Sequence, residues 1–323
     1  MTPPASENET APDGPQNTTD QPPCADQVDD ASVSPAPPRQ PQFPGFGQAV
    51  LLVLAVLGLQ VALGLGLALG SIVVATARGE AAGAAHVIDR PAVIAVINLL
   101  AFGAPLAFGV WWQKARARDV LPLGPPRIGL LAPIVLTVLG LAILGSDLDN
   151  LLRRVFPLPG WLARFFDALS SARTHPIESV LLLVLVAPLT DELFFRGLIL
   201  RGFLARYAVR PAVLGSAFLF AALHLNPWQF FSALALGLLF GWWFWRTGSL
   251  FPCLAGHACA NSLVFSPTLL PFRIQGFNDQ TWTSGAVALQ PWWFDGAGLA
   301  LLLGGAFWFC RLTPRPAGRG AAD

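Results

Sequence analysis

Charge is scarce in this chain of 323 residues: 12% are Asp, Glu, Lys or Arg, and 54% are hydrophobic. An average soluble domain carries roughly twice that share of charge. The apolar residues also form long runs without charges, which a soluble domain could not cover with polar surface. The composition excludes an ordinary water-soluble fold and predicts an all-α, polytopic integral membrane protein.

Neither the net charge nor the cysteine spacing indicates a nucleic-acid partner or a metal site. A formal net charge of +1 provides no basic field of the kind that gathers nucleic acid, so no nucleic-acid partner is expected. The cysteines Cys24, Cys253, Cys259 and Cys310 show no CxxC spacing. This spacing predicts neither a disulfide framework nor a thiolate zinc site, and we interpret the thiols as inert apolar side chains.

The first 46 residues differ from the rest of the chain. They contain eleven of the 29 prolines, seven acidic residues and one arginine. Such a segment is expected to be a disordered, Pro-rich acidic tail, and without a basic and an apolar region it is not a cleaved signal peptide. We therefore expect a transmembrane domain over 47–311, with its catalytic core at about 177–266, and a short flexible tail over 312–323.

Apolar runs long enough to cross a hydrocarbon layer of about 30 Å predict about eight transmembrane helices. An even number places both termini on one side of the membrane. The expected spans are 48–76, 91–112, 127–146, 177–200, 211–226, 229–245, 249–270 and 296–311.

The distribution of basic residues predicts that both termini are cytoplasmic in the cell membrane. This orientation places twelve Lys and Arg residues in inner segments and seven in outer segments. Four of the seven fall in the third-to-fourth connection, where 151–169 is expected to form an amphipathic interfacial helix. The tryptophans of two stretches are expected to anchor helix ends at the interfaces: Trp242, Trp243, Trp245, Trp292 and Trp293.

One predicted span carries two acids and an arginine, although a charge inside a membrane costs at least ~2.5–3.5 kcal/mol and usually has a function. Glu192 and Arg196 stand at i and i+4 on one helix face and are expected to pair. A structural ion pair explains these two residues but leaves Asp191 without a partner. An acid left over beside a satisfied pair suits proton exchange near neutral pH.

Two later spans carry a histidine each. His224 follows Phe220 by four residues, and Asn261 follows His257 by four. A lone histidine or amide in an apolar helix is often a satisfied structural group. Counted from the inner boundary, however, both histidines and Asp191 lie near mid-membrane, which favours one shared polar cavity. Such a set can activate water and stabilise an oxyanion, the chemistry that amide hydrolysis needs.

In order and spacing, these motifs resemble the CAAX-protease and bacteriocin-processing family of intramembrane proteases, which includes the prenyl-protein endopeptidases. The family pattern is EExxxR, then FxxxH, then HxxxN or a similar polar residue in place of the asparagine. The resemblance covers about 177–266, where the matching residues are Asp191, Glu192, Arg196, Phe220, His224, His257 and Asn261. It implies a membrane protein or peptide substrate, lipidated in some members.

The resemblance also implies a role for each residue. Asp191 and His224 would activate water, while His257 and Asn261 would stabilise the tetrahedral oxyanion. Glu192 and Arg196, with Phe220, would shape the site. The family expects glutamate at the first position, so Asp191, shorter by one methylene, puts the geometry for catalysis in question.

No cofactor is certain from the sequence. Zinc could take His224, His257 and Asp191 as ligands and keep an open water position, but an HExxH signature is absent. The residues equally support a metal-free mechanism, which we favour slightly. Rival functions are a catalytically silent scaffold or immunity-type binding protein and, with less support because no internal repeat is evident, a small-solute transporter.

Overall fold

The computed structural model describes residues 43–79, 90–114, 116–125, 127–171, 175–266, 270–279, 282 and 287–314. Regular structure in this part of the chain is helical, without a strand. The prediction of an all-α fold is therefore confirmed. Most of the expected N-terminal and C-terminal tails, and Cys24, lie outside the described residues.

Helices occur at every one of the eight expected spans. A long helical stretch from 176 to 204 is divided by two π-helical segments into five consecutive parts. The elements are α1 (Phe46–Arg78), α2 (Pro91–Trp112), α3 (Ala117–Val120), η2 (Ile128–Leu130), α4 (Leu131–Val155), α5 (Gly160–Ser171), α6 (Pro176–Val180), η3 (Leu181–Val186), α7 (Ala187–Glu192), η4 (Leu193–Leu200), α8 (Arg201–Leu204), α9 (Val209–Leu223), α10 (Pro227–Thr247), α11 (Phe251–Ser262), η5 (Leu263–Phe265) and α13 (Trp292–Leu312).

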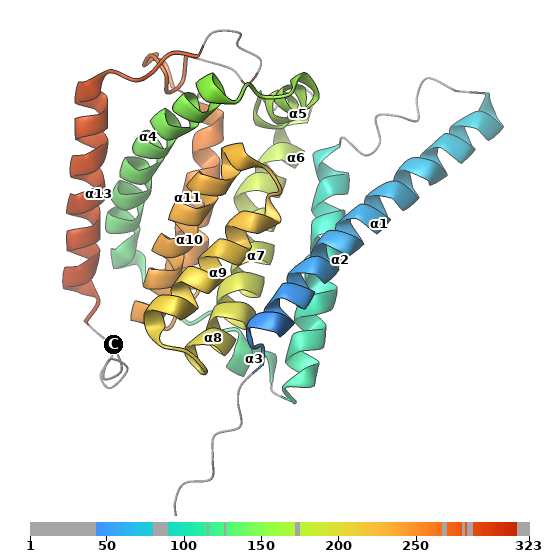
Figure 1. Cartoon of the computed structure of the whole chain (residues 1–323), viewed down its shortest axis with the longest axis horizontal. Helices are drawn as coiled ribbons and strands as arrows, with labels where there is room; N and C mark the ends of the chain where they lie inside the picture. The colour runs from blue at the N-terminus through green and yellow to red at the C-terminus, as the bar shows by residue number, and fades with distance from the viewer. Residues whose placement is uncertain are drawn as a thin grey trace, which may run out of the picture. The chain divides into compact units, whose positions relative to one another are not determined.

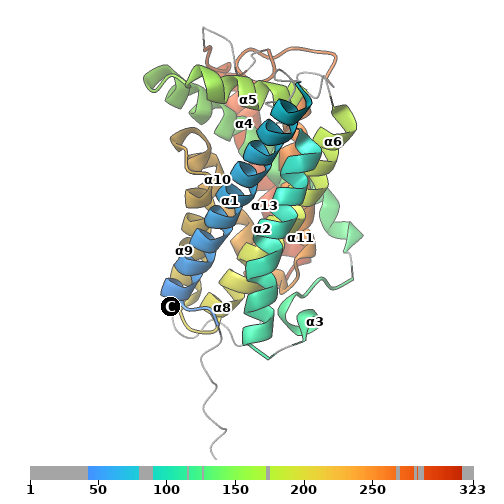
Figure 2. The same cartoon turned by 90° about the vertical axis from the view of Figure 1, so that its right-hand side faces the viewer.

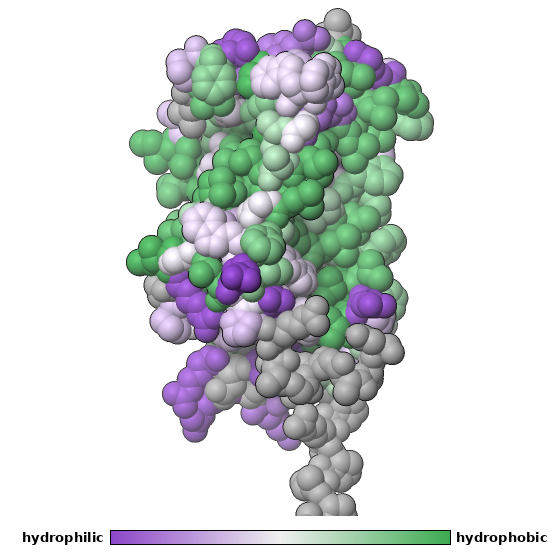
Figure 3. All heavy atoms as spheres, turned by 90° about the vertical axis from the view of Figure 1, so that its left-hand side faces the viewer, coloured by the Kyte–Doolittle hydropathy of each residue, from purple (hydrophilic) through white to green (hydrophobic). Residues whose placement is uncertain are grey.

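Four helical segments are long and apolar enough to cross a membrane: Phe46–Arg78, Pro91–Trp112, Ile128–Val155 and Trp292–Leu312. α9 and the stretch Phe251–Phe265 are apolar but shorter. On the side formed by α13, apolar residues fill a broad middle band between hydrophilic ends (Figure 3). The chain is thus an integral membrane protein, while the number of spans and the orientation of the termini stay predictions.

The most deeply buried helical stretch is η4, in which every residue from Phe194 to Leu200 is buried, and α10 packs against it. α10 also contacts α4, α9 and α11, while α1 pairs with α2 on one side and α13 with α4 on the other (Figure 1). α1 is largely exposed, and Gln60 joins it to α2 through a 3.0 Å hydrogen bond from its Nε2 to Oδ1 of Asn98. The long helical stretch from 176 to 204 packs against α2, α9, α10 and α11 and carries the acidic motif into their midst.

Two expectations about the membrane interface need correction. The interfacial helix starts later than 151, because Pro157 and Pro159 separate the end of α4 from the start of α5. α5 itself lies across the end of the helices (Figure 2). Trp243 is not an interfacial anchor: it is fully buried on α10, whereas Trp292, at the start of α13, is 84% exposed.

Glycines allow α4 and α13 to touch along their backbones. A Cβ atom added to Gly140 would lie 2.3 Å from the backbone nitrogen of Leu302, and one added to Gly305 would lie 2.6 Å from Oγ1 of Thr137. Small residues are typical of helix contacts in membranes, where close packing replaces the hydrophobic driving force. The neighbouring Gly304 faces open space, with nothing within 4 Å of an added Cβ.

This contrast gives a stability prediction. Gly305→Leu should separate α13 from α4 and destabilise the protein by at least ~1–3 kcal/mol, the usual cost of overpacking. Gly304→Leu adds the same side chain one residue away and should leave stability nearly unchanged. Thermal unfolding of both variants in detergent is the measurement, and equal melting temperatures would contradict the close α4–α13 contact.

Candidate active site

The two acids lie at the end of α7, between two wider helical turns. Asp191 and Glu192 are its last residues, preceded by η3 and followed by η4, both π-helical. Pro188 supplies no backbone N–H in this region. Turns of this kind inside α-helices are frequently found at functional sites. The periodicity of apolar residues does not reveal them.

Glu192 is the centre of the site. Its fully buried Oε1 accepts hydrogen bonds from Nη1 of Arg196 at 3.0 Å and from Nδ1 of His257 at 2.8 Å. The expected i, i+4 pair therefore forms. The bond from His257 joins the helical stretch from 176 to 204 to α11, and it assigns the Nδ1 proton of that histidine, because a carboxylate only accepts.

Arg196 is buried and held on several sides. Its Nη2 donates to the carbonyl oxygen of Gly237 at 3.3 Å, and its guanidinium lies 4.6 Å from the ring centre of Phe220 and 5.4 Å from that of Phe240. Stacking of this kind adds electrostatic attraction to packing. One cation thus connects its own helix with α9 and α10.

Asp191 is placed differently from Glu192. Its side chain is 15% exposed, and Oδ2 lies 4.0 Å from Nε2 of His257. This distance is too long for a direct hydrogen bond and suits a single bridging water. His257 therefore binds Glu192 through Nδ1 and faces Asp191 with Nε2. Spacing along the sequence could not predict this arrangement.

His224 lies directly after the last residue of α9. Its Nδ1 is 3.1 Å from the carbonyl oxygen of Phe220, which assigns the ring proton to Nδ1 and leaves Nε2 as an acceptor in the neutral ring. Both histidine rings meet the Phe220 ring edge to face, His224 at 5.3 Å and His257 at 5.9 Å between centres. Phe220 therefore connects the second motif to the third.

The helix that carries His224 is shorter than the expected span, which runs to 226. Asn226 instead begins the next helix: its Oδ1 accepts a hydrogen bond from the backbone nitrogen of Gln229, and Pro227 occupies the first turn of α10. Both are strong helix-start signals. His224 consequently lies at a turn between two helices rather than inside one.

Asn261 is not joined to Glu192 by a hydrogen bond. Its Nδ2 donates to the carbonyl oxygen of Leu183 at 2.8 Å and so ties α11 to η3, one turn beyond His257. Of the predicted site residues, the structure brings together Asp191, Glu192, Arg196 and His257. His224 lies beside them through the shared ring of Phe220. The amide of Asn261 instead holds two helices together. The role of Asn261 as an oxyanion donor stays a prediction.

Sequence reasoning missed the aromatic support of the site. The buried ring of Phe240 lies 5.7 Å from the His257 ring and stacks on Trp243 at 5.6 Å. A Cβ added to Gly256 would lie 2.5 Å from the Trp243 ring and 2.9 Å from the Phe240 ring, so α11 approaches α10 closely just before His257. Nothing in the apolar run of α10 distinguishes Phe240 from its neighbours.

The expected zinc ligands are only partly gathered. Asp191 and Nε2 of His257 face one another, and neutral His224 has an acceptor nitrogen, a donor set chemically suited to zinc. Among the described residues, however, no three His, Cys, Asp or Glu side chains form a group that could hold a metal ion. Zinc binding stays a prediction.

Comparison with known proteins bears on this same region. Residues 173–263 match the family model described as type II CAAX prenyl endopeptidase Rce1-like. The resemblance to CAAX proteases is thereby confirmed over this segment. Searches of curated proteins and of solved structures found no match to the chain. The matched segment contains the acidic motif, both histidines and Asn261, and it supports a protease at the general level.

The two neighbouring acids should respond differently to loss of charge. Glu192→Gln leaves Arg196 buried without its counterion, and breaking a buried pair costs ~3–5 kcal/mol. Asp191→Asn removes a partly exposed charge outside the pair and should change stability by less than ~1 kcal/mol. Thermal unfolding of the two purified variants provides the comparison. A larger loss for Asp191→Asn would refute the central position of Glu192.

Proposed function

We propose that the protein is an intramembrane endopeptidase that hydrolyses a peptide bond with water activated at Asp191. The observation that carries this proposal is the 4.0 Å separation between Oδ2 of Asp191 and Nε2 of His257, beside a fully buried Glu192–Arg196 pair. The pair fixes the histidine, and the remaining acid has a side chain that is 15% exposed. The match to CAAX-type endopeptidases supports the same reaction class.

In the proposed reaction, a water molecule between Asp191 and the histidines attacks the carbonyl carbon of the scissile bond. Asp191 accepts the water proton, and Nε2 of His224, an acceptor in the neutral ring, orients the same water. The new C–O bond forms as the carbonyl electrons move onto oxygen. Transfer of the proton from Asp191 to the leaving nitrogen then breaks the C–N bond and restores the carboxylate.

His257 is proposed to stabilise the oxyanion. Its Nδ1 proton is engaged by Glu192, and when the ring is protonated on both nitrogens, Nε2 donates toward the reacting oxygen. Glu192 compensates the positive charge of this ring, and Arg196 in turn fixes Glu192. Both residues therefore act as positioning residues, and neither needs to touch the substrate.

The proposed substrate is a peptide or protein located at the membrane. The family description names a CAAX prenyl endopeptidase, so the informative probe is a peptide that ends in a prenylated CAAX sequence, compared with the same peptide without the prenyl group. Cleavage of the prenylated peptide alone would show that the peptidase requires a lipidated substrate. Cleavage of both would assign a peptidase that does not require the lipid.

Aspartate at a position where the family has glutamate favours one rival, a catalytically silent relative that binds a partner. Moving the carboxylate at position 191 distinguishes the proposed peptidase from the silent relative. If the site is built for aspartate, Asp191→Glu should move the carboxylate against Nε2 of His257, displace the water and slow cleavage by about 100-fold, the cost of a shift of about 1 Å.

Asp191→Asn should lower cleavage by ~10²–10⁴-fold, because it removes the proposed base while keeping the size of the side chain. New protein termini in membranes that contain equal amounts of wild type, Asp191→Asn and Asp191→Glu are the measurement. Phe218→Leu, a change on the exposed face of α9, serves as the control. Identical profiles in wild type and both Asp191 variants would favour the silent relative.

A further inference from the structure

A cavity lies outside the polar cluster formed by Asp191, Glu192, Arg196 and His257. It has a volume of about 390 Å³ and is lined by residues of α4, α10, α11, η5 and the connection that leads to α13. None of the residues of the polar cluster lines it. It nevertheless lies close to the cluster, because its wall includes Leu236 and Ala260, the chain neighbours of Gly237 and Asn261. The volume falls in the range of small-molecule sites.

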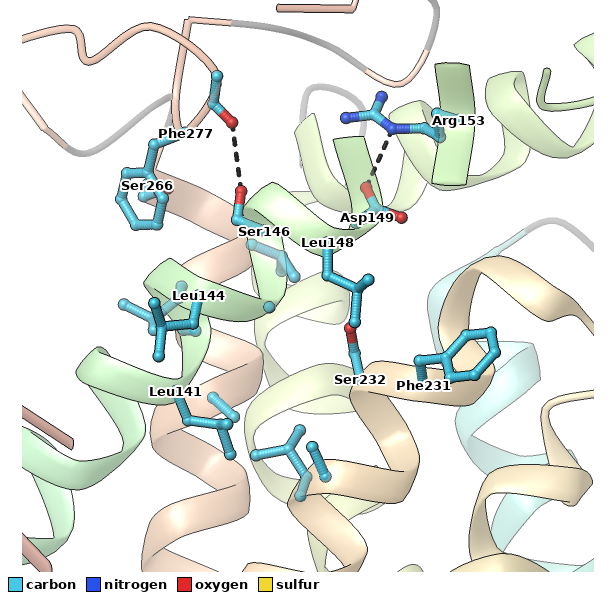
Figure 4. Close-up of a pocket in the computed structure, with 18 of the residues that line it drawn as sticks. Leu141, Leu144, Ser146, Leu148, Asp149, Arg153, Phe231, Ser232, Ser266 and Phe277 are labelled. Atoms are coloured by element: carbon cyan, nitrogen blue, oxygen red, sulfur yellow. Dashed lines mark hydrogen bonds and ion pairs between the residues drawn. The ribbon is translucent and has the colours of Figure 1, made fainter. Parts of the chain in front are cut away.

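Polarity changes from one end of this cavity to the other. Figure 4 shows Leu141 and Leu144 of α4 at one end and the Asp149–Arg153 ion pair at the opposite end. Between Leu141 and Arg153 the helix rises by ~18 Å at 1.5 Å per residue. The long, mainly apolar part and the short charged part match the two parts of a membrane lipid.

The charged end has no excess of either sign. Nε of Arg153 lies 3.0 Å from Oδ2 of Asp149, Nη2 donates to Oδ1 of Asn150 at 2.7 Å, and the guanidinium lies 5.4 Å from the ring centre of Trp282. One cation and one anion at this end of the cavity complement a headgroup that carries one charge of each sign. An anionic headgroup would meet Asp149 without compensation.

The part of the cavity wall formed by Gly276 and Phe277 is bound to α4 by hydrogen bonds. The carbonyl oxygen of Gly276 accepts hydrogen bonds from Nδ2 of Asn150 at 2.6 Å and from Oγ of Ser146 at 3.2 Å, which holds the neighbouring Phe277 at the cavity wall. The cavity is therefore a built feature of the fold.

We propose that this cavity binds one acyl chain of a zwitterionic membrane lipid, with the chain along α4, α10 and α11 and the headgroup at Asp149 and Arg153. The site is independent of peptide hydrolysis. The bound acyl chain would contact Leu236 of α10 and Ala260 of α11, which are the chain neighbours of Gly237 and Asn261. The identity of the lipid can therefore influence how α10 and α11 pack.

Photolabelling tests the proposal with the full chain in phosphatidylglycerol vesicles, because the anionic headgroup of this host lipid should not compete for the proposed site. The probe is a phosphatidylcholine analogue with a diazirine in its acyl chain, added in rising proportion, and labelled peptides are identified by mass spectrometry. Segments 141–148 and 260–264 should be labelled with saturation at a low proportion of probe. The exposed face of α1 should be labelled in direct proportion to the probe.

Variants that fill the cavity should abolish the saturable labelling. Gly145 has room for a larger side chain, since the nearest atom to an added Cβ is Oγ of Ser232 at 3.7 Å. Gly145→Leu and, from the opposite wall, Ser232→Leu should each lower labelling of the cavity segments by about tenfold. Gly304→Leu, which adds the same side chain on the open side of α13, should not.

Size-exclusion profiles like that of the wild type establish that the variants are folded. Two results would overturn the proposal: labelling of the cavity segments that rises in proportion with that of α1, or saturable labelling that persists in both cavity variants. Failure of added unlabelled phosphatidylcholine to reduce labelling of the cavity segments would overturn the zwitterionic headgroup. Because the measurement does not involve cleavage, it is unaffected by failure of the proposed peptidase activity.

Discussion

The buried carboxylate of Glu192 is the group on which the arrangement of the site depends. A charge inside a membrane protein is tolerated only when it is paired and hydrogen-bonded. Here one oxygen atom accepts from both Arg196 and His257, so it connects the stretch that carries the acids with α11. Because these partners occupy Glu192, Asp191 is left to face the remaining nitrogen of His257.

Support for that carboxylate extends well beyond the matched segment. Phe240 contacts both Arg196 and His257, and it stacks on Trp243, which in turn stacks on Phe309 of α13 at 5.1 Å. α13 lies against α4 through glycines, outside residues 173–263. The segment that matches the family therefore depends on helices outside it for the rigidity of its histidine.

Close backbone contact recurs as the means of fixing helix positions. In a membrane, lipid is as apolar as the side chains, so specific contacts must come from small residues and satisfied polar groups. Gly256 allows α11 to reach the rings of α10, and Gly305 allows α13 to reach α4. Asn261, binding the Leu183 carbonyl, adds a polar tie between α11 and η3. These contacts hold His257 in a fixed direction.

The sequence by itself determined the membrane class, the helices and the Glu192–Arg196 pair, because these follow from local composition and from spacing along one helix. Element ends were less certain: Asn226 and Pro227 start α10 where the apolar run suggested a longer α9. Only the tertiary structure decided which acid His257 binds, that Asn261 binds Leu183, and that Phe240 and Trp243 are buried beside the site. Those contacts join residues far apart in the chain, and side-chain directions across helices depend on packing that no local pattern encodes.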